Sequence, residues 1–587
     1  MRQRALPILA CVAVALAFAL PSVVRCGPDG CHQVLDRPSD TDDSRQFVMM
    51  WEVSRVSLRD FGQLPTWNPY HCGGVVHYLD PQVPFPGPLF FLLFALVPAA
   101  AAIKLWHFAH LVAGALGARR LAADEGANAP EQILAAAMTV ACGAVGHHLG
   151  GGQLWFAPFL LLPWVLWAHR RALREPRWAL LAGGLLALAA LEGGVYPVPL
   201  MILTVLFDAL LRLRAPLDRR GLLLSLPLLL GSFALLGAVK LVPVLAFLGR
   251  NPRLTALDDQ MSLGEVLQAW TLRDHPRPFP PHIYVWPEYG NYVGAVPIVL
   301  LACGAVLALR DRERRIDLGV FALLVWCALG GIPGLSLFGV LHELPIFRSL
   351  RVPSRFLHPA TVLGALLAVH ALIRLRASLS RTRLAAAVPL AELVLAAAVA
   401  ADLAITNGPR LQQGLGAPVP LAPASREFHQ EASLDYRSLP FNPQRGLGTP
   451  ICYGGFEWPV SRALWFGRAP QERIEPPDAG EVRELRWSPS AIDLEVSLRA
   501  PAVVVVNQNF EPGWAASEGM LASRAGLLAL PLSPGTRTVR LRHRPEGFAL
   551  GLALTLAGAV LCAAAVRGLT PQRVATLRSA IARRLRS

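Results

Sequence analysis

The sequence predicts an α-helical polytopic membrane protein with about twelve transmembrane helices and a small β-rich domain near its C-terminal end. The chain has 587 residues, of which 53% are hydrophobic and only 16% are charged. Apolar runs of roughly 17 to 25 residues recur along it, and this is the length that crosses about 30 Å of hydrocarbon. A soluble helical protein would carry charges at every turn. Here the charges are gathered between the runs.

Short arginine clusters at the ends of the apolar runs account for the formal net charge of +15. They lie at 119–120, 169–174, 212–220, 310–315, 374–383 and 567–586. Basic clusters in short loops are typical of the cytoplasmic side of a membrane protein. Because they do not form a patch with interleaved aromatic residues, they argue against nucleic acid as a partner.

The apolar run at 5–24 follows Met1–Arg4 and lacks a convincing cleavage site, so we expect a retained first helix with its N-terminus inside. The other expected crossings are 102–119, 131–147, 153–168, 178–194, 196–211, 221–246, 292–309, 316–333, 356–374, 384–405 and 547–566. Every arginine cluster then falls inside. Residues 86–101 are apolar too, but a full crossing there would invert every later loop. We expect this segment to be re-entrant, or part of one long broken helix.

This topology divides the chain into three parts. A transmembrane domain spans 1–405 and includes a large first outer loop, 25–85. An extracytoplasmic domain spans 406–545, and a final helix with a basic cytoplasmic tail spans 546–587. Alternating apolar and polar residues at 491–496 and 538–542 predict strands, so we expect the domain at 406–545 to be β-rich.

Four of the nine cysteines fall outside the membrane in this topology, where disulfides persist. They are Cys26, Cys31, Cys72 and Cys452. Three pairings exist, and sequence does not choose among them. The other five lie in apolar runs, where we expect unreactive thiols.

Acidic residues, among them Asp42 and Asp43, precede a helical-looking stretch at 47–61 in the first outer loop. A carboxylate at the membrane surface suits a base that deprotonates an acceptor. It equally suits a divalent cation such as Mg²⁺ or Mn²⁺ held against a phosphate. It also suits a solvated turn that caps the next helix. The residues alone leave all three open.

Three arginines, Arg348, Arg351 and Arg355, lie outside in this topology, against the usual bias. Guanidinium groups bind phosphate bidentately, so a lipid-linked phosphate would explain them. Pairing with lipid headgroups or with acids of the soluble domain would explain them too. The aromatic stretch 284–292 suits either stacking on a sugar or an interfacial belt.

Several polar residues lie near the outer ends of predicted helices. Both lysines of the chain, Lys104 and Lys240, are in this position, and so is Glu192. Charges inside a membrane domain mark candidate binding residues, although snorkelling near a helix end is cheap. His147 and His148 suit a phosphate or a metal, but adjacent residues face different sides of a helix, which argues against joint ligation.

Four motifs, in this order along the chain, resemble YfhO-type bacterial membrane proteins, which are relatives of the GT-C glycosyltransferases. The first is the loop 43–74 with its core GQLPTWNPYHCGG, and the second is the Gly-His turn at 146–148 before Trp155 and Pro158. The third is FRSLRVPSRF at 347–356. The fourth is FEPGW at 510–514 followed by EG at 518–519 and LSPG at 532–535.

The resemblance implies a GT-C-like, inverting transferase of the bacterial inner membrane that uses a polyprenyl-phosphate sugar on the outer face. The acceptor would be an envelope glycan, a lipid or a protein. In such enzymes an acidic residue of the first outer loop is the base, which matches Asp43, with Asp42 as its rival. The substrate-binding candidates are Arg348, Arg351, Arg355, His148, Glu192, Lys240, Trp67, Asn68 and Tyr70.

Two departures touch the presumed cavity. Lys240 stands where the family often has Gln, and Glu192-Gly193-Gly194 replaces a second Gly-His. The sugar and the acceptor therefore do not carry over. Two other functions stay open: a transporter or flippase of a lipid-linked glycan, and a non-catalytic envelope assembly protein. Membrane lipids are partners in every case.

Overall fold

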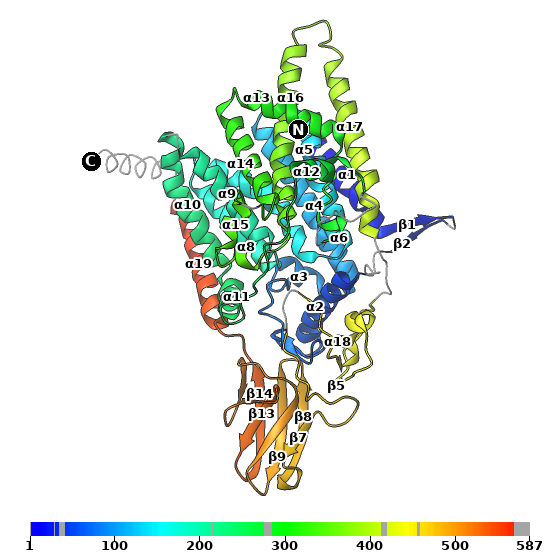
Figure 1. Ribbon diagram of the computed structural model, residues 1–587, viewed down its shortest axis with the longest axis vertical. Coiled ribbons are helices and arrows are strands. Elements are labelled where there is room, and N and C mark those ends of the chain that lie inside the picture. Colours follow the sequence, from blue (N-terminus) through cyan, green and yellow to red (C-terminus); the bar gives the residue numbers. More distant parts are fainter. Residues whose placement is uncertain are drawn as a thin grey trace, which may run out of the picture.

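The computed structural model describes residues 2–28, 30–34, 41–213, 216–274, 284–332, 334–412, 419–454 and 458–568. Helices form one elongated bundle, and a β-rich unit lies at one end of it (Figure 1). The hairpin of α16 (Leu357–Leu379) and α17 (Val388–Asn407) stands at the opposite end, near the N-terminus. Most of the basic tail predicted after the last helix, from residue 569 onward, lies outside the described residues.

Seven helical segments of the described chain are long and apolar enough to cross a membrane, so this is a multi-pass membrane protein. They are α1 (Arg2–Val23), α4 (Ala99–Asp124), α5 (Ala129–Val140) with α6 (Gly143–Gly150), α10 (Pro216–Leu236), α16 (Leu357–Leu379), α17 (Val388–Asn407) and α19 (Phe548–Gly568). Shorter helices occupy the other predicted crossings: η1 (Leu154–Leu161) with α7 (Leu162–Ala172), α8 (Arg177–Leu191), α9 (Pro197–Arg212), α13 (Ala295–Ala308) and α14 (Arg312–Ala328). The crossing predicted at 221–246 contains the end of α10 and most of a second helix, α11 (Ala238–Arg250). Twelve crossings stay a prediction.

Some predicted crossings are interrupted, which the apolar pattern alone did not indicate. The crossing predicted at 131–147 divides into α5 and α6 because Gly143 approaches the 291–292 backbone closely. A Cβ at Gly143 would lie 2.4 Å from the Tyr292 nitrogen. Residues 86–101 contain the short helix α3 (Pro88–Leu93) and the start of α4. Six residues of helix span only about 9 Å, so α3 is too short to cross on its own.

The helix α2 (Asp42–Arg59) forms most of the first outer loop and begins earlier than the predicted stretch at 47–61. The Thr41 hydroxyl oxygen caps it by accepting a hydrogen bond from the Ser44 backbone N–H. In turn, the Ser44 hydroxyl oxygen accepts one from the Thr41 backbone N–H. Glu52 and Arg55 form an ion pair that is fully buried. The capping box starts the helix at the acids, which places Asp42 and Asp43 in its first turn.

Two four-stranded sheets, between Glu472 and His543, form the β-rich part of the domain predicted at 406–545 (Figure 1). One has the order β12 (Ala522–Arg524), β13 (Leu527–Leu532), β10 (Ala502–Asn509), β7 (Glu472–Glu475). The other has the order β11 (Trp514–Ala516), β14 (Gly535–His543), β9 (Ala491–Leu498), β8 (Gly480–Ser488). The two segments predicted as strands pair with one another, with Ile492 opposite Leu541. Their alternating apolar residues face the core, as the period of two predicts.

Short elements connect these parts. They are β1 (Val24–Gly27), β2 (Gly30–Gln33), β3 (Trp67–Asn68), β4 (Val75–Val76), α12 (Leu263–Thr271), η2 (Trp286–Glu288), α15 (Leu337–His342), η3 (Phe347–Ser349), η4 (Pro353–Phe356), η5 (Gly408–Gln412), β5 (His429–Gln430), η6 (Tyr436–Phe441), α18 (Asn442–Arg445), β6 (Leu447–Gly448) and η7 (Pro477–Ala479). Disulfides join Cys26 to Cys31 and Cys72 to Cys452. The second one ties the first outer loop to a segment 380 residues later.

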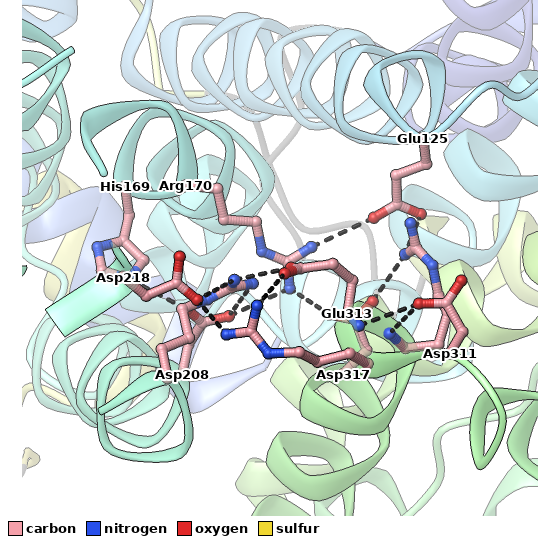
Figure 2. A network of polar contacts seen from close by, with 11 residues as sticks. Glu125, His169, Arg170, Asp208, Asp218, Asp311, Glu313 and Asp317 are labelled. Carbon is pink, nitrogen blue, oxygen red and sulfur yellow. Dashed lines mark hydrogen bonds and ion pairs between the residues drawn. The ribbon is translucent and has the colours of Figure 1, made fainter. Parts of the chain in front are cut away.

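A network of charged side chains joins helix ends at several of the predicted cytoplasmic clusters (Figure 2). At its centre, Arg170 of α7 pairs with Glu125, Asp208 and Asp317, which come from the end of α4, from α9 and from α14. The other residues drawn in Figure 2 include His169, Asp218, Asp311 and Glu313. We call these residues the charge network. Because Asp208 and Asp317 are buried, their ion pairs hold the helix ends together on this side.

Candidate functional site

Asp43 lies in the first turn of α2 and receives hydrogen bonds from two distant segments. The Tyr453 hydroxyl donates to its Oδ1 at 2.7 Å, and Gln153 Nε2 donates to its Oδ2 at 2.9 Å. Burial and the Asp43 carboxylate together raise the pKa of the Tyr453 phenol, so it stays a donor. A carboxylate offers about four lone-pair positions. The two donors therefore orient Asp43 and leave it able to accept a proton.

Gln153 connects Asp43 to two further polar residues. His148 Nδ1 donates to the Gln153 side-chain oxygen, and Gln153 Nε2 also lies 3.4 Å from Glu288 Oε1. The His148 ring stacks on Phe156, with ring centroids 4.3 Å apart. Gln153 lies in the connection between α6 and η1. The turn between the crossings predicted at 131–147 and 153–168 therefore brings its side chain to Asp43.

Arg355 is buried and is fully engaged by its surroundings. Its guanidinium contacts both oxygens of Glu288 at 2.9 to 3.2 Å. The rings of Trp155 and Tyr196 lie 4.4 and 4.2 Å from its central carbon. Burial alone would raise the pKa of Glu288, but Arg355 and then His148 outweigh it, so this pKa lies below its ordinary value. Glu288 is therefore an anion at neutral pH.

Arg351 and Arg348 are more exposed than Arg355. Arg351 lies 5.6 Å from the Tyr284 ring, and its backbone N–H donates to the Tyr196 hydroxyl at 3.4 Å. Arg348 pairs with Glu343 at 3.2 Å on the surface. Between Arg351 and Arg355, Val352 has a φ of +62°, a strained conformation for a β-branched residue. The chain thus turns sharply so that Arg351 points outward and Arg355 inward.

An apolar groove of about 840 Å³ lies beside these arginines. Residues of α8, α9, α10, α11 and α19 line it, together with the loop 343–350. The charged residues of its lining are Lys240, Arg253, Glu343 and Arg348. The groove and the Asp43 site share a wall, since Val195 and Leu350 line the groove and the next residues, Tyr196 and Arg351, belong to the site.

Glu192 and Lys240, two of the predicted binding residues, have partners other than Asp43. Glu192 pairs with His110 at 2.7 Å, and both side chains are buried. The Lys240 ammonium lies within hydrogen-bond distance of four backbone carbonyls of the first outer loop. They are those of Tyr78, Asp80, Val83 and Phe85, at 3.0 to 3.2 Å. Lys240 therefore orders this loop, and the described residues show neither Glu192 nor Lys240 bonded to Asp43.

Trp67, Asn68 and Tyr70 belong to the first outer loop, in the part that packs against the β-rich domain. Trp67 Nε1 donates to Gln508 Oε1 at 2.6 Å, and its ring packs 5.6 Å from that of Trp514. Asn68 Oδ1 accepts from the Tyr70 N–H at 3.0 Å. All three are almost fully buried. Their contacts in the described residues join two parts of the chain.

The rival acid, Asp42, points to the surface. It pairs with Arg45 at 2.8 Å, and about half of its side chain is exposed.

Within the described ranges, no group of three or more His, Cys, Asp or Glu residues could hold a metal ion. The Gln153 amide nitrogen lies against both Asp43 and Glu288, so a donor occupies the space between the two carboxylates.

The histidine pair divides as its spacing predicts. His148 faces Gln153, whereas His147 accepts a bond from Arg410 at 3.2 Å.

Three residues of the site were not among the predicted candidates: Gln153, Glu288 and Tyr453. Glu288 is the acid within the aromatic stretch 284–292. Tyr453 follows Cys452, and the disulfide between Cys452 and Cys72 helps to hold it near α2.

No protein-family model matches this chain, and no curated protein matches it. Among solved structures it is similar to the arabinofuranosyltransferase AftD from mycobacteria, determined by single-particle cryo-EM. That match has 21% identity and a TM-score of 0.44, and it covers 69% of this chain and 27% of AftD. A mutant form of AftD matches at 20% identity and a TM-score of 0.43, over 68% and 28% of the two chains. Likeness at this level does not establish a family. The YfhO-type resemblance stays a prediction.

Proposed function

We propose that the protein is a GT-C-like membrane glycosyltransferase that transfers a sugar from a polyprenyl-phosphate donor to an envelope glycan, lipid or protein on the outer face of the bacterial inner membrane. The observation that carries this proposal is the site around Asp43. An oriented, partly exposed carboxylate lies in one hydrogen-bonded network with His148, Glu288 and Arg355, and these residues come from four distant segments.

The apolar groove fits the lipid part of such a donor. Its lining is dominated by aliphatic side chains of helices that lie in the membrane domain. A polyprenyl chain in the groove would place its phosphate at the shared wall, near Arg351. That guanidinium is exposed and has no carboxylate partner among the described residues, unlike the guanidinium of Arg355. We therefore assign the donor phosphate to Arg351, with Arg348 beside it.

The proposed step is an inverting displacement at the anomeric carbon. Asp43 takes the proton of the acceptor hydroxyl as its oxygen attacks, and the bond from the anomeric carbon to the phosphate oxygen breaks. Polyprenyl phosphate leaves with the bonding electrons, and Arg351 balances its charge. Tyr453 and Gln153 keep the carboxylate in place for the proton transfer.

The first prediction concerns Asp43 and its neighbour. Asp43→Asn keeps the shape but removes the base, so transfer of label from a pool of polyprenyl-phosphate sugars should fall by at least about 100-fold. Asp42→Asn is the matched control, because Asp42 points to the surface, and it should keep nearly all activity. Equal loss in both variants, or full activity of Asp43→Asn, would contradict the assignment.

Metal dependence is tested in the same assay. The network gives Asp43 and Glu288 an amide donor in common, and the leaving phosphate has a guanidinium nearby. The proposed step therefore uses neither Mg²⁺ nor Mn²⁺, and transfer should continue in EDTA.

A further inference from the structure

A second groove lies where the β-rich domain meets the membrane domain. It has a volume of about 550 Å³, and it is separate from the Asp43 site. Its lining comes from residues 61–66, which follow α2, from the ends of β8, β9 and β14, and from the start of α19. The α2 helix has 18 residues, which corresponds to about 27 Å between Asp43 and this groove.

The groove carries a surplus of positive charge. Arg486, Arg542 and Arg544 line it, against a single carboxylate, Asp493. Asp493 is already paired with Arg542 at 2.6 Å. Arg486 and Arg544 are exposed and have no carboxylate partner within the described ranges. Two guanidinium groups are therefore available to an anion.

Neutral hydrogen-bonding groups lie among these arginines. Ser488 and Ser490 line the groove, and the Ser488 hydroxyl donates to Gln63 Oε1 at 3.1 Å. The amide nitrogen of Gln63 is buried and has no partner among the described residues. An unused donor beside guanidinium groups suits an oxyanion with several acceptor oxygens, such as a phosphate.

The groove continues onto the lipid-facing side of α19. Phe548 and Ala549 line it, and Leu552 and Leu556 follow on the same helical face, both exposed. The opposite face packs closely on α10 and α11, since a Cβ at Gly551 would lie 2.5 Å from the Ala238 carbonyl oxygen. Because α19 enters the membrane at this point, a ligand in the groove has its polar end at the headgroup level and apolar surface below it.

We propose that this groove binds the headgroup phosphate of an anionic glycerophospholipid of the outer leaflet, whose acyl chains lie along α19. The phosphate contacts Arg486, Arg544 and the Gln63 amide. The bound lipid holds the β-rich domain at the membrane surface. This proposal does not depend on the transferase activity.

The test uses the purified full-length protein and native mass spectrometry with phosphatidylglycerol or phosphatidylcholine added. Phosphatidylglycerol should bind at least about tenfold more tightly than phosphatidylcholine. The double variant Arg486→Gln with Arg544→Gln should lose this preference. The matched control removes two arginines of the same domain that have other partners, Arg483→Gln with Arg499→Gln. It should bind like the wild type.

Equal binding of the two lipids, or an unchanged preference in the double variant, would overturn the proposal. A second measurement identifies the source of the phosphate. Phosphatidylglycerol should raise the melting temperature of the wild type, and inorganic phosphate or glycerol 3-phosphate should not. Equal stabilisation by the soluble phosphates would assign the groove to a free phosphate and exclude the lipid.

Discussion

The ion pair between Arg355 and Glu288 gives Arg355 a different role from those of Arg348 and Arg351. The Arg355 guanidinium forms a bidentate bond with Glu288 and lies against two aromatic rings. Few of its N–H groups are therefore free to bind a substrate phosphate. Glu288 in turn contacts Gln153, which orients Asp43. Arg355 is thus a positioning residue that acts on the candidate base through two other side chains.

Arg355→Lys should therefore lower the rate of transfer by at least about tenfold. A lysine keeps the charge but cannot bond both oxygens of Glu288 while lying flat between two rings. Transfer rates at saturating donor measure this, and kcat should fall more than KM rises. Arg374→Lys, which changes an exposed arginine at a predicted cytoplasmic loop, is the control. Activity of Arg355→Lys close to that of the wild type would refute the positioning role.

Buried His71 makes stability depend on pH. Burial lowers its pKa to about 4, whereas an unfolded histidine titrates near 6.5. Between these values the unfolded chain binds a proton that the folded chain does not. The free energy of unfolding therefore falls by about 1.4 kcal/mol for each pH unit as pH drops from 6.5 to 4.

His71→Gln should flatten this dependence. The glutamine side-chain oxygen can still accept the hydrogen bond of the Tyr453 N–H, whose nitrogen lies 3.0 Å from Nε2 of His71. Melting temperatures of the purified protein at pH 7, 5.5 and 4.5 measure the effect. His77, whose pKa burial and then Lys240 lower to about 3, adds the same slope to both proteins. A variant as pH-sensitive as the wild type would contradict this account.

At the scale of elements, the disulfide between Cys72 and Cys452 connects the first outer loop to the residue that follows Cys452. That residue, Tyr453, donates to Asp43. The bond thus fixes a donor of the candidate site through a covalent link that closes a very long loop. Closing a loop of even 100 residues stabilises a fold by roughly 4 to 5 kcal/mol in the chain-entropy model.

Cys452→Ser should therefore reduce both stability and transfer, and Tyr453→Phe should reduce transfer alone. Cys31→Ser is the control, because the Cys26–Cys31 disulfide closes an exposed hairpin that contributes no residue to the site. Transfer assays and melting curves of the three variants, with and without reductant, measure these effects. Unchanged transfer by Cys452→Ser and Tyr453→Phe would mean that Asp43 needs no donor from this segment.

The sequence predicted the helical membrane class, the β-rich domain and its two paired strands, because apolar runs and period-two alternation report burial directly. It also selected Asp43, His148 and Arg355, which the structure joins in one network. It could not predict Gln153 or Tyr453 as their partners. Those contacts depend on how the turn between α6 and η1 packs against the start of α2 and on a choice among three disulfide pairings, and neither leaves a local pattern.

For the whole molecule, the charge network bears on the choice between an enzyme and a transporter. Alternating access requires the helix ends on each side to separate in turn. Here Arg170 joins α4, α7, α9 and α14 through carboxylates that are mostly buried. Separating them would leave the Arg170 charge without its three carboxylate partners, at a cost of several kcal/mol. The network therefore favours a protein whose predicted cytoplasmic side stays closed, which suits an enzyme that works at the outer face.

Arg170→Met tests this directly. The substitution removes the cation that Glu125, Asp208 and Asp317 share, while Arg212 and Arg314 remain beside them. The protein should therefore lose about 3 kcal/mol of stability, the low end for breaking a buried ion pair. Arg177→Met removes an exposed arginine paired only with Glu175 and should cost less than about 1 kcal/mol. Thermal unfolding in detergent measures both. In proteoliposomes, neither the wild type nor Arg170→Met should move a labelled polyprenyl-phosphate sugar across the bilayer, while transfer per folded molecule stays the same. Faster lipid movement in Arg170→Met would instead show that the network is a gate, and would favour the transporter.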